Sequence, residues 1–512
     1  MLARVFSFGL LGIEAYPIEI EVDVSPGLPA VTLVGLADAA IRESKERVKS
    51  AIKNSGFAWP SERITVSLAP SDTKKEGACF DLAIALGILA ATEQLNSQRL
   101  KDYYVLGELS LDGSLRPCKG ILPVSLSAAK SKLENIILPE ANAKEACAVR
   151  DISIWPLKTL RETVEFLHNP QMVQPFKMDL AELFRENCTY PLDLSEVKGQ
   201  YLAKRALEVA VAGGHNILMI GPPGSGKTML AKRIPTIMPD LTLEEALEIT
   251  RIHSAAGALP LKQGIVARRP FRSPHHTASN TALVGGGSIP QPGQISLSHQ
   301  GVLFLDELPE FRRDSLEALR QPLEDGSIRI SRALKSFVFP ASFMLVCAMN
   351  PCKCGRFNDP KSSCGCSTTQ IHSYRSKISG PLLDRIDIHI EIPAARYQDL
   401  SGNLAAEASA LIKERVNRAR AIQRERFKTA SEPIFYNAQM SHRQVRKFCI
   451  LDKEGSELLK MAMTELNFSA RAYDKILKIS RTIADLAGGG DIKTGHLSEA
   501  IQYRGLDRDF FV

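Results

Sequence analysis

Gly221-Pro-Pro-Gly-Ser-Gly-Lys-Thr228 matches, without a mismatch, the pattern G-x-x-x-x-G-K-[ST] of a phosphate-binding loop. The apolar residues 217–220 before it predict a buried strand, and residues 229–234 after it predict a helix. The pattern needs this strand–loop–helix context, because backbone N–H groups and the positive end of the helix then surround a triphosphate. The alternative is an ordinary glycine-rich turn before a helix.

The predicted nucleotide-binding residues of the loop are Gly221, Pro222, Pro223, Gly224, Ser225, Gly226, Lys227 and Thr228. Lys227 is expected to reach the β- and γ-phosphates, and the Thr228 hydroxyl is expected to bind Mg²⁺. A second apolar strand, at 301–305, ends in Asp306-Glu307. Asp306 suits Mg²⁺, and Glu307 suits polarisation of the attacking water. Such a pair is often only the start of a loop, but downstream of a matched phosphate loop it predicts an ATPase with ATP and Mg²⁺ as cofactors.

Length and composition set the outer limits of the interpretation. A chain of 512 residues predicts about three domains, and 44% hydrophobic with 24% charged residues predicts folded cores. The excess of 64 basic over 57 acidic residues permits an acidic partner such as nucleic acid without requiring one. The start lacks a signal-peptide cleavage site, and the uncharged stretches 209–226 and 277–305 are interrupted by Gly and Pro. We therefore expect a cytoplasmic protein with no membrane partner.

Residues 1–168 predict an α/β domain ahead of the phosphate-binding loop, with a strand at 18–24 and an amphipathic helix at 38–55. The order of elements resembles the proteolytic domain of Lon-type proteases, a fold of the ribosomal S5 domain 2 type. That family uses a Ser–Lys dyad, but Cys79 takes the Ser position here and Leu122 takes the Lys position. Because leucine cannot accept a proton, the domain is predicted to lack peptidase activity. Residues 169–190 predict a linker.

Residues 191–399 resemble the ATPase core of the AAA+ class, and the mostly helical residues 400–512 resemble its helical lid. This resemblance implies that Val197 and Gln200 lie against the adenine. It also implies that Asn350 is the first sensor and that Arg471 is the second sensor. Arg385, in Ser379-Gly-Pro-Leu-Leu-Asp-Arg385, resembles the arginine finger that acts on a neighbouring subunit's nucleotide. Such a finger implies a homo-hexameric ring.

Four cysteines in an insertion at 350–368 form the pattern C-x-C-x₉-C-x-C: Cys352, Cys354, Cys364 and Cys366. Four thiolates suit tetrahedral Zn²⁺ and leave no open position for catalysis, so a structural zinc site is predicted. Free thiols or a redox pair are the alternatives.

Two basic segments are candidates for contact with DNA. A hairpin expected at 326–339 carries Arg329, Arg332 and Lys335, and residues 251–272 carry Arg268, Arg269 and Arg272. Cations that line a pore can follow a phosphate backbone. A solvated basic surface is the alternative.

Several features occur together in one chain: the Lon-like domain, the run 214–228, Arg269-Pro-Phe-Arg-Ser-Pro-His-His276, the cysteine pairs and Ser379–Arg385. By this combination the chain is identified as a member of the YifB/ComM family of magnesium-chelatase-like AAA+ ATPases. The resemblance covers essentially the whole sequence. It implies an ATP-driven hexameric helicase that migrates branched DNA during recombination, notably natural transformation. Its implied partners are single-stranded and branched DNA and recombination proteins. An ATP-dependent protease and a chelatase-type or protein-remodelling ATPase are the alternatives. His275 and His276 receive no role at this stage.

Overall fold

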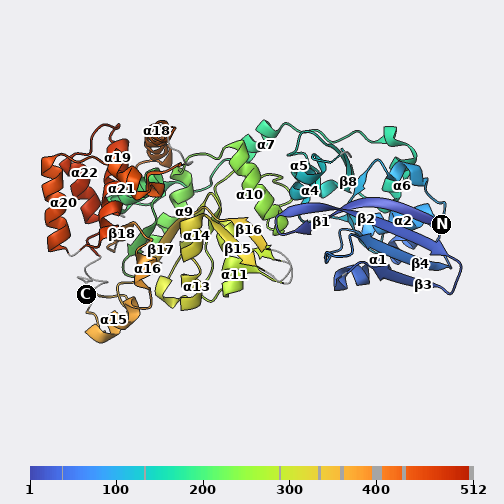
Figure 1. Ribbon diagram of the computed structural model, residues 1–512, viewed down its shortest axis with the longest axis horizontal. Coiled ribbons are helices and arrows are strands. Elements are labelled where there is room, and N and C mark those ends of the chain that lie inside the picture. Colours follow the sequence, from blue (N-terminus) through green and yellow to red (C-terminus); the bar gives the residue numbers. More distant parts are fainter. Residues whose placement is uncertain are drawn as a thin grey trace. The chain divides into compact units, whose positions relative to one another are not determined.

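The computed structural model describes residues 1–36, 38–75, 77–131, 134–287, 290–331, 336–357, 363–394, 406–428, 434–466 and 468–506. The chain forms two compact units (Figure 1). The first comprises Met1–Thr189, Thr242–Ala267 and Gly287–Pro292, and the second comprises Tyr190–Leu241, Arg268–Gly286 and Gly293–Val512. Two segments from inside the range expected for the ATPase core therefore pack with the first unit. No helix among the described residues is long and apolar enough to cross a membrane.

The first unit is built on a seven-stranded sheet of order β3-β4-β2-β1-β5-β8-β9 (blue to cyan in Figure 1). Its strands are β1 (Leu2–Leu11), β2 (Glu14–Ser25), β3 (Ala30–Val34), β4 (Arg63–Ala69), β5 (Tyr104–Val105), β8 (Asn135–Pro139) and β9 (Ser153–Leu157). Strands β2, β1 and β4 pair antiparallel, whereas β5, β8 and β9 pair parallel. The strand predicted at 18–24 is confirmed as part of β2, and its alternating side chains are buried on one face.

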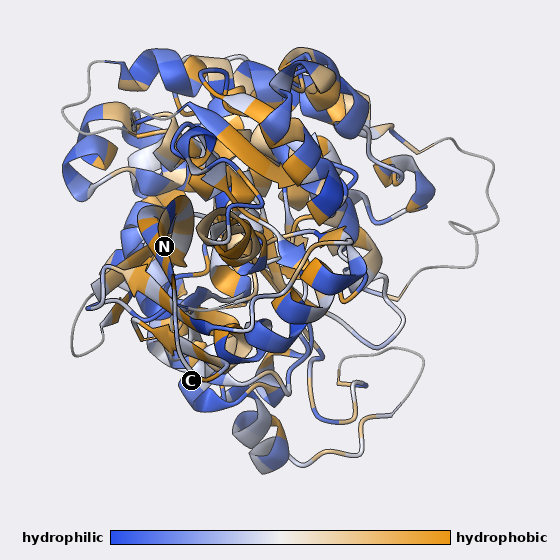
Figure 2. Ribbon diagram, turned by 90° about the vertical axis from the view of Figure 1, so that its right-hand side faces the viewer, coloured by the Kyte–Doolittle hydropathy of each residue, from blue (hydrophilic) through white to orange (hydrophobic). Residues whose placement is uncertain are grey.

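Helices complete the first unit. They are α1 (Ala39–Asn54), α2 (Asp81–Ala91), α3 (Ser97–Leu100), α4 (Ile121–Ala128), α5 (Ala143–Ala146), α6 (Leu160–His168), α7 (Leu180–Asn187) and α10 (Leu243–Ala255). The predicted helix at 38–55 is confirmed as α1, and the Asp38 side chain caps it by accepting from the Ile41 N–H group. All residues of α2 are buried, because this nearly uncharged helix is enclosed by the core on every side. The peripheral helices in Figure 2 alternate hydrophilic and hydrophobic segments, as helices with one buried face do.

A five-stranded parallel sheet of order β11-β14-β17-β10-β18 organises the second unit. The strands are β10 (Ile217–Ile220), β11 (Phe271–Arg272), β14 (Val302–Leu305), β17 (Met344–Met349) and β18 (Ile388–Glu391). All residues of β10, β14 and β17 are buried, as expected for parallel strands covered on both faces. Since parallel strands end at the same edge, the residues after β10, β14 and β17 meet there. The predicted α/β fold is confirmed.

The other elements of the second unit flank this sheet. They are α8 (Tyr201–Gly213), α9 (Lys227–Ile237), α11 (Asn280–Val284), α12 (Gln294–Leu297), α13 (Arg313–Glu317), α14 (Arg320–Asp325), the hairpin β15 (Ser327–Ser331) and β16 (Ser336–Pro340), α15 (Thr368–Arg375) and α16 (Gly380–Leu383). The C-terminal helices are α18 (Ser409–Phe427), α19 (His442–Phe448), α20 (Lys453–Glu465), α21 (Ala470–Leu486) and α22 (Thr494–Gln502). Val416 of α18 and Ile483 of α21 belong to the same buried cluster as Ile217 and Phe304 of the sheet. The C-terminal helices therefore share the core of the parallel sheet.

Candidate functional site

The phosphate-binding loop runs from the end of β10 into the first turn of α9. A side chain at Gly221 would place its Cβ 2.2 Å from the Ile392 carbonyl oxygen, so the close approach of these two backbones requires glycine. Gly226, at the N-terminal end of α9, has a φ of 89°, which also favours glycine. The sequence thus bends the loop so that backbone N–H groups and the helix N-terminus face one space.

Lys227 lies inside this loop. Its Nζ donates to the carbonyl oxygens of Gly221, at 2.7 Å, and Pro222, at 2.9 Å. Burial lowers the pKa of Lys227, and the nearby carboxylates of Asp306 and Glu307 oppose that shift. The ammonium group is thus held at the place where the loop can bind phosphate oxygens, with both carboxylates nearby.

Thr228 and Asp306 come together although 78 positions separate them, and the Thr228 Oγ1 donates to Asp306 Oδ2 at 2.8 Å. This hydroxyl and this carboxylate oxygen lie beside the phosphate-binding loop. Oxygen atoms of these kinds are the ligands that Mg²⁺ takes from proteins. Glu307 follows Asp306 with a φ of 53° and a side chain that is 55% exposed. Its carboxylate is therefore available to a water molecule.

Two further predicted residues contact the loop. Asn350, directly after β17, lies with its Oδ1 3.4 Å from the Lys227 Nζ. Gln200 donates through Nε2 to the carbonyl oxygens of Ser225, at 3.3 Å, and Pro393, at 2.9 Å. Val197, three positions earlier, is buried. The structure thus gathers Lys227, Thr228, Asp306, Glu307, Asn350 and Gln200 around one loop.

Arg385 and Arg471 lie elsewhere in the second unit, along a cleft of about 660 Å³. Arg471 Nη1 donates to Asp384 Oδ2 at 2.6 Å, and Arg385 forms an ion pair with Glu324. Burial, together with the nearby Arg471, lowers the pKa of Arg385. Among the described residues, neither guanidinium forms a hydrogen bond or ion pair with the phosphate-binding loop of its own chain.

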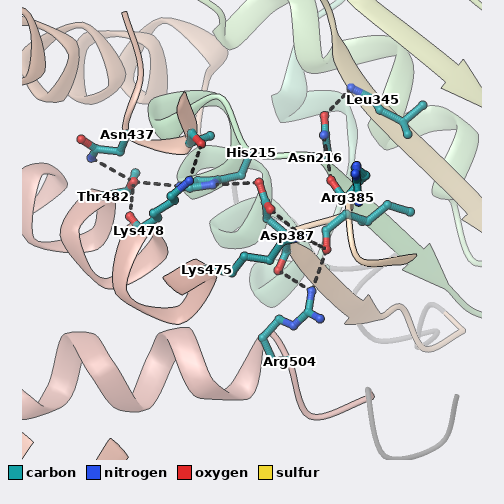
Figure 3. Close-up of polar contacts among 12 residues, drawn as sticks. His215, Asn216, Leu345, Arg385, Asp387, Asn437, Lys475, Lys478, Thr482 and Arg504 are labelled. Atoms are coloured by element: carbon teal, nitrogen blue, oxygen red, sulfur yellow. Dashed lines mark hydrogen bonds and ion pairs between the residues drawn. The ribbon is translucent and has the colours of Figure 1, made fainter. Parts of the chain in front are cut away.

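A buried polar network anchors the segment that carries Arg385 (Figure 3). Asp387 lies 3.2 Å from His215 Nδ1 and 3.0 Å from Lys475 Nζ. Burial alone would raise the pKa of Asp387, but Lys475 and His215 outweigh it and hold that pKa well below its usual range. Asn216 donates to the Arg385 carbonyl oxygen at 2.9 Å. The segment 385–387 is therefore tied both to Asn216, directly before β10, and to Lys475 of α21.

The four predicted zinc ligands form one cluster, with all their Sγ atoms within 4.8 Å of one another. The Cys352 Sγ lies 3.3 Å from Cys354 Sγ and 3.7 Å from Cys364 Sγ. Four sulfurs at about 2.3 Å from a central Zn²⁺ lie about 3.8 Å apart, so the cluster fits this ion. A Cβ at Gly355 would lie 2.6 Å from Pro223 Cδ, so the turn that follows Cys354 packs directly against the phosphate-binding loop.

The candidate DNA contacts are placed differently from one another. Arg329 is exposed on β15, whereas Arg332 and Lys335 lie outside the described residues. Arg268 and Arg272 are partly buried, and burial lowers the pKa of Arg272.

Arg269 is only 7% exposed. Its guanidinium donates to the carbonyl oxygens of Pro239, at 2.6 Å, Gln300, at 2.8 Å, and Asp240, at 3.3 Å. Each of the three guanidinium nitrogens donates to a backbone carbonyl, and the side chain is buried, so it is not presented to a phosphate. Arg269 thus joins segments within the second unit instead of presenting its guanidinium to DNA, as the sequence suggested.

The Lon-like region shows no activated nucleophile at the position that the sequence singled out. Burial raises the pKa of the Cys79 thiol to about 12, so the thiol stays protonated at neutral pH. Leu122, at the position of the lysine partner, is fully buried, and its backbone N–H donates to Glu145 Oε1 at 2.8 Å. Cys79 is half-buried, and a thiol that stays protonated is not an activated nucleophile.

One residue that faces the site was missed by sequence reasoning. His276 Nδ1 lies 3.4 Å from Glu307 Oε2. The signal that would reveal it is the parallel pairing of β11 with β14, which brings the residues after both strands to one edge. Strand β11 has only two residues, so the alternation of apolar and polar residues that reveals a strand in a sequence cannot appear there.

Comparisons with known proteins agree with this arrangement. Residues 193–400 match the family model "Magnesium chelatase, subunit ChlI", residues 20–142 match "Subunit ChlI of Mg-chelatase" and residues 406–504 match "Magnesium chelatase, subunit ChlI C-terminal". The competence protein ComM of Haemophilus influenzae is 45% identical over 99% of this chain and 98% of its own length. The uncharacterized protein YifB of Escherichia coli is 43% identical over the same shares. Lon protease 2 of Bacillus subtilis is 26% identical over 35% of this chain and 34% of its own length.

Proposed function

We propose, from the premise that the chain belongs to the ComM/YifB family of magnesium-chelatase-like AAA+ ATPases, that it is an ATP-driven motor acting on branched DNA. The observation that carries the ATPase part is the convergence of Lys227, Thr228, Asp306 and Glu307 at the edge of one parallel sheet. The competence protein among its relatives, which matches over nearly the whole chain, supports DNA as the substrate.

In the proposed reaction each residue has a separate role. Lys227 binds the β- and γ-phosphates, and Gln200 and Val197 flank the adenine. Thr228 and Asp306 would hold Mg²⁺, which would supply charge neutralisation at the phosphates. Glu307 orients and polarises the attacking water, and Asn350 senses the γ-phosphate from the end of β17.

The position of the two arginines supports a ring. Within one chain, Arg385 and Arg471 are held along a cleft by Asp384, Glu324 and the Asp387 network. We propose that they complete the nucleotide site of the adjacent subunit in a homo-hexamer, where a guanidinium stabilises the charge on the transferring phosphoryl group.

We assign the domains as follows. Residues 1–168 form a Lon-like domain of the ribosomal S5 domain 2 type without a Ser–Lys dyad, and 169–190 form the linker. Residues 191–399 form the AAA+ core with a zinc-binding insertion at 350–368, and 400–512 form the helical lid. The parallel sheet supports the AAA+ core of this proposal. The C-terminal helices share the buried core of that sheet, and 242–267 and 287–292 pack with the first unit, so the proposed division follows the order of the chain and not the two compact units. The proposed location is the cytoplasm.

DNA passes through the ring in this proposal, along a surface that includes Arg329 and, from the sequence, Arg332 and Lys335. Exposed cations on a hairpin can follow a phosphate backbone without reading sequence. The net charge of +7 is compatible with this contact.

The test is the ATPase rate of the purified protein with and without forked or Holliday-junction DNA, followed by a strand-displacement assay. We expect DNA to stimulate hydrolysis and ATP to drive strand exchange. An ATPase rate that does not change when DNA is added, together with no displaced strand, contradicts the DNA motor. That outcome favours a chelatase-type or protein-remodelling ATPase, because the matched family models are those of magnesium chelatase.

A further inference from the structure

Residues 242–267 lie in the chain between two elements of the nucleotide site, yet they pack with the first unit. We call them the inserted segment. Helix α9, which begins in the phosphate-binding loop, precedes the segment, and strand β11, which pairs with β14, follows it. Because β14 ends directly before Asp306, both ends of the inserted segment lead into elements that carry the proposed ATPase residues.

Arg269 holds the two ends of the inserted segment together. Its guanidinium donates to the carbonyl oxygens of Pro239 and Asp240, just before the segment. Its backbone N–H donates to the Tyr190 Oη at 3.0 Å. All four residues belong to the second unit. The inserted segment thus leaves and re-enters the second unit at one fixed place, so its two ends move together.

Within the first unit, the inserted segment is hydrogen-bonded at the start of α4. The Ser254 Oγ of α10 donates to Glu145 Oε1, which also accepts from the Leu122 backbone N–H at 2.8 Å. The Ser254 carbonyl oxygen accepts from the Gly120 N–H at 3.0 Å. Burial raises the pKa of Glu145, and the hydrogen bond from Ser254 opposes that shift. Because a buried carboxylate that loses a donor is destabilised, these bonds hold α10 in place.

Apolar side chains cover the same place. Leu247 of α10 packs on a buried cluster that contains Leu122 of α4 and Leu180 of α7. Leu122 stands where the resemblance to Lon-type proteases puts the catalytic lysine. The place of that lost base is therefore filled by leucine side chains from α7, which precedes the second unit in the chain, and from α10.

The remainder of the inserted segment also lies on the first unit. A Cβ at Gly264 would lie 2.8 Å from Lys144 Cβ and 3.0 Å from the Lys144 carbonyl oxygen, so the two backbones are in close contact. The Val266 N–H donates to the Thr250 Oγ1 at 2.9 Å, which ties this turn back to α10. The inserted segment is thus attached at several points along its length.

We propose that the surface around Leu122 and Glu145 is the coupling site of the first unit: it holds the inserted segment, and through it the ATPase cycle moves the Lon-like domain. This inference rests on the proposed function and deepens it, because it gives the Lon-like domain a mechanical role in place of peptide cleavage. The occupant of the site is the chain's own α10, which the pairing of Ser254 with Glu145 selects.

The first test is hydrogen–deuterium exchange of the full-length protein, with and without a non-hydrolysable ATP analogue. We expect the analogue to change the exchange rates of peptides from both α10 and α4 by about twofold or more. Leu247→Glu places a carboxylate among leucine side chains and should undock α10. The effect of the analogue should then persist in α10 and disappear from α4. An α4 that does not respond in the natural protein, or responds equally in Leu247→Glu, overturns the proposal.

The second test compares ATP hydrolysis with strand displacement. We expect Leu247→Glu to keep its DNA-independent ATPase rate within about twofold but to lose about tenfold in strand displacement, the usual size of a coupling effect. Ser254→Ala adds no charge and should lower strand displacement by about fivefold, since one hydrogen bond is lost. Strand displacement at the natural rate in both variants overturns the coupling role.

The matched control is Leu243→Glu, which makes the same change on the same helix at a side chain that is 39% exposed. Its hydrolysis, strand displacement and exchange should stay within about twofold of the natural protein. A natural protein that displaces no strand defeats the DNA motor, whereas the exchange of α4 still tests the coupling. The two failures are therefore distinguishable.

Discussion

Lys227 and Glu307 lie within one site but act on different parts of the nucleotide, so substitutions at the two positions should separate binding from hydrolysis. Lys227→Ala removes the ammonium group that the loop holds at the phosphates. We expect the affinity for ATP to fall about 100-fold, which corresponds to roughly 3 kcal/mol, the upper range for a hydrogen bond to a charged group. Titration with a fluorescent ATP analogue measures the change.

Glu307→Gln keeps the shape of the side chain but removes the base. We expect ATP affinity within about twofold of the natural protein and turnover reduced by about 10²- to 10⁴-fold, the usual contribution of general base catalysis. Single-turnover hydrolysis at saturating ATP is the measurement. Turnover at the natural rate would show that another group activates the water.

At the scale of elements, the cysteine cluster and the phosphate-binding loop form one packed assembly. Gly355 lies between Cys354 and the loop, with a φ of 78°, and a Cβ there would lie 2.6 Å from Pro223 Cδ. Gly355→Ala therefore has to displace Pro223, and the left-handed backbone adds about 1 kcal/mol of strain. We expect KM for ATP to rise about tenfold, as measured by steady-state hydrolysis.

The control is Gly365→Ala, because a Cβ at Gly365 meets nothing within 4 Å. Its KM should match that of the natural protein. In the proposed zinc-bound protein, a chelator should act in the same direction as Gly355→Ala, since the thiolates would lose the ion that would fix the cluster. A KM that responds to neither Gly355→Ala nor chelation would show that the cluster does not support the loop.

The same elements show what the sequence can and cannot predict. The loop at Gly221–Thr228 and the apolar strand before Asp306 are local patterns, and the structure has a strand directly before each of Gly221 and Asp306. The His276–Glu307 contact depends on the pairing of β11 with β14, which no local pattern encodes. Arg269 looks like a surface cation in sequence, yet carbonyl groups from distant segments surround it. Long-range pairing and burial, rather than motif chemistry, are what sequence reasoning lacks here.

At the scale of the whole assembly, the ring hypothesis makes a prediction about mixed subunits. A heterologous ring places the arginine face of one chain against the nucleotide of the next. Arg385→Ala chains keep an intact loop, and Lys227→Ala chains keep an intact arginine. Each variant alone should be inactive. When the two are mixed before assembly, about a quarter of the interfaces combine an intact loop with an intact arginine from the neighbour.

We therefore expect the mixture to regain up to about a quarter of the natural turnover, measured with ATP, DNA and equal amounts of both chains. The same experiment with Arg471→Ala in place of Arg385→Ala tests whether Arg471 also acts across the interface. Recovery means that Arg471 acts on the nucleotide of the neighbouring subunit. The hydrogen bond from Arg471 to Asp384, the residue next to Arg385, favours this outcome. Failure of Arg471→Ala to recover, alongside recovery of Arg385→Ala, would place Arg471 on its own chain's nucleotide. If neither mixture recovers, no arginine is exchanged between subunits and the ring hypothesis is wrong.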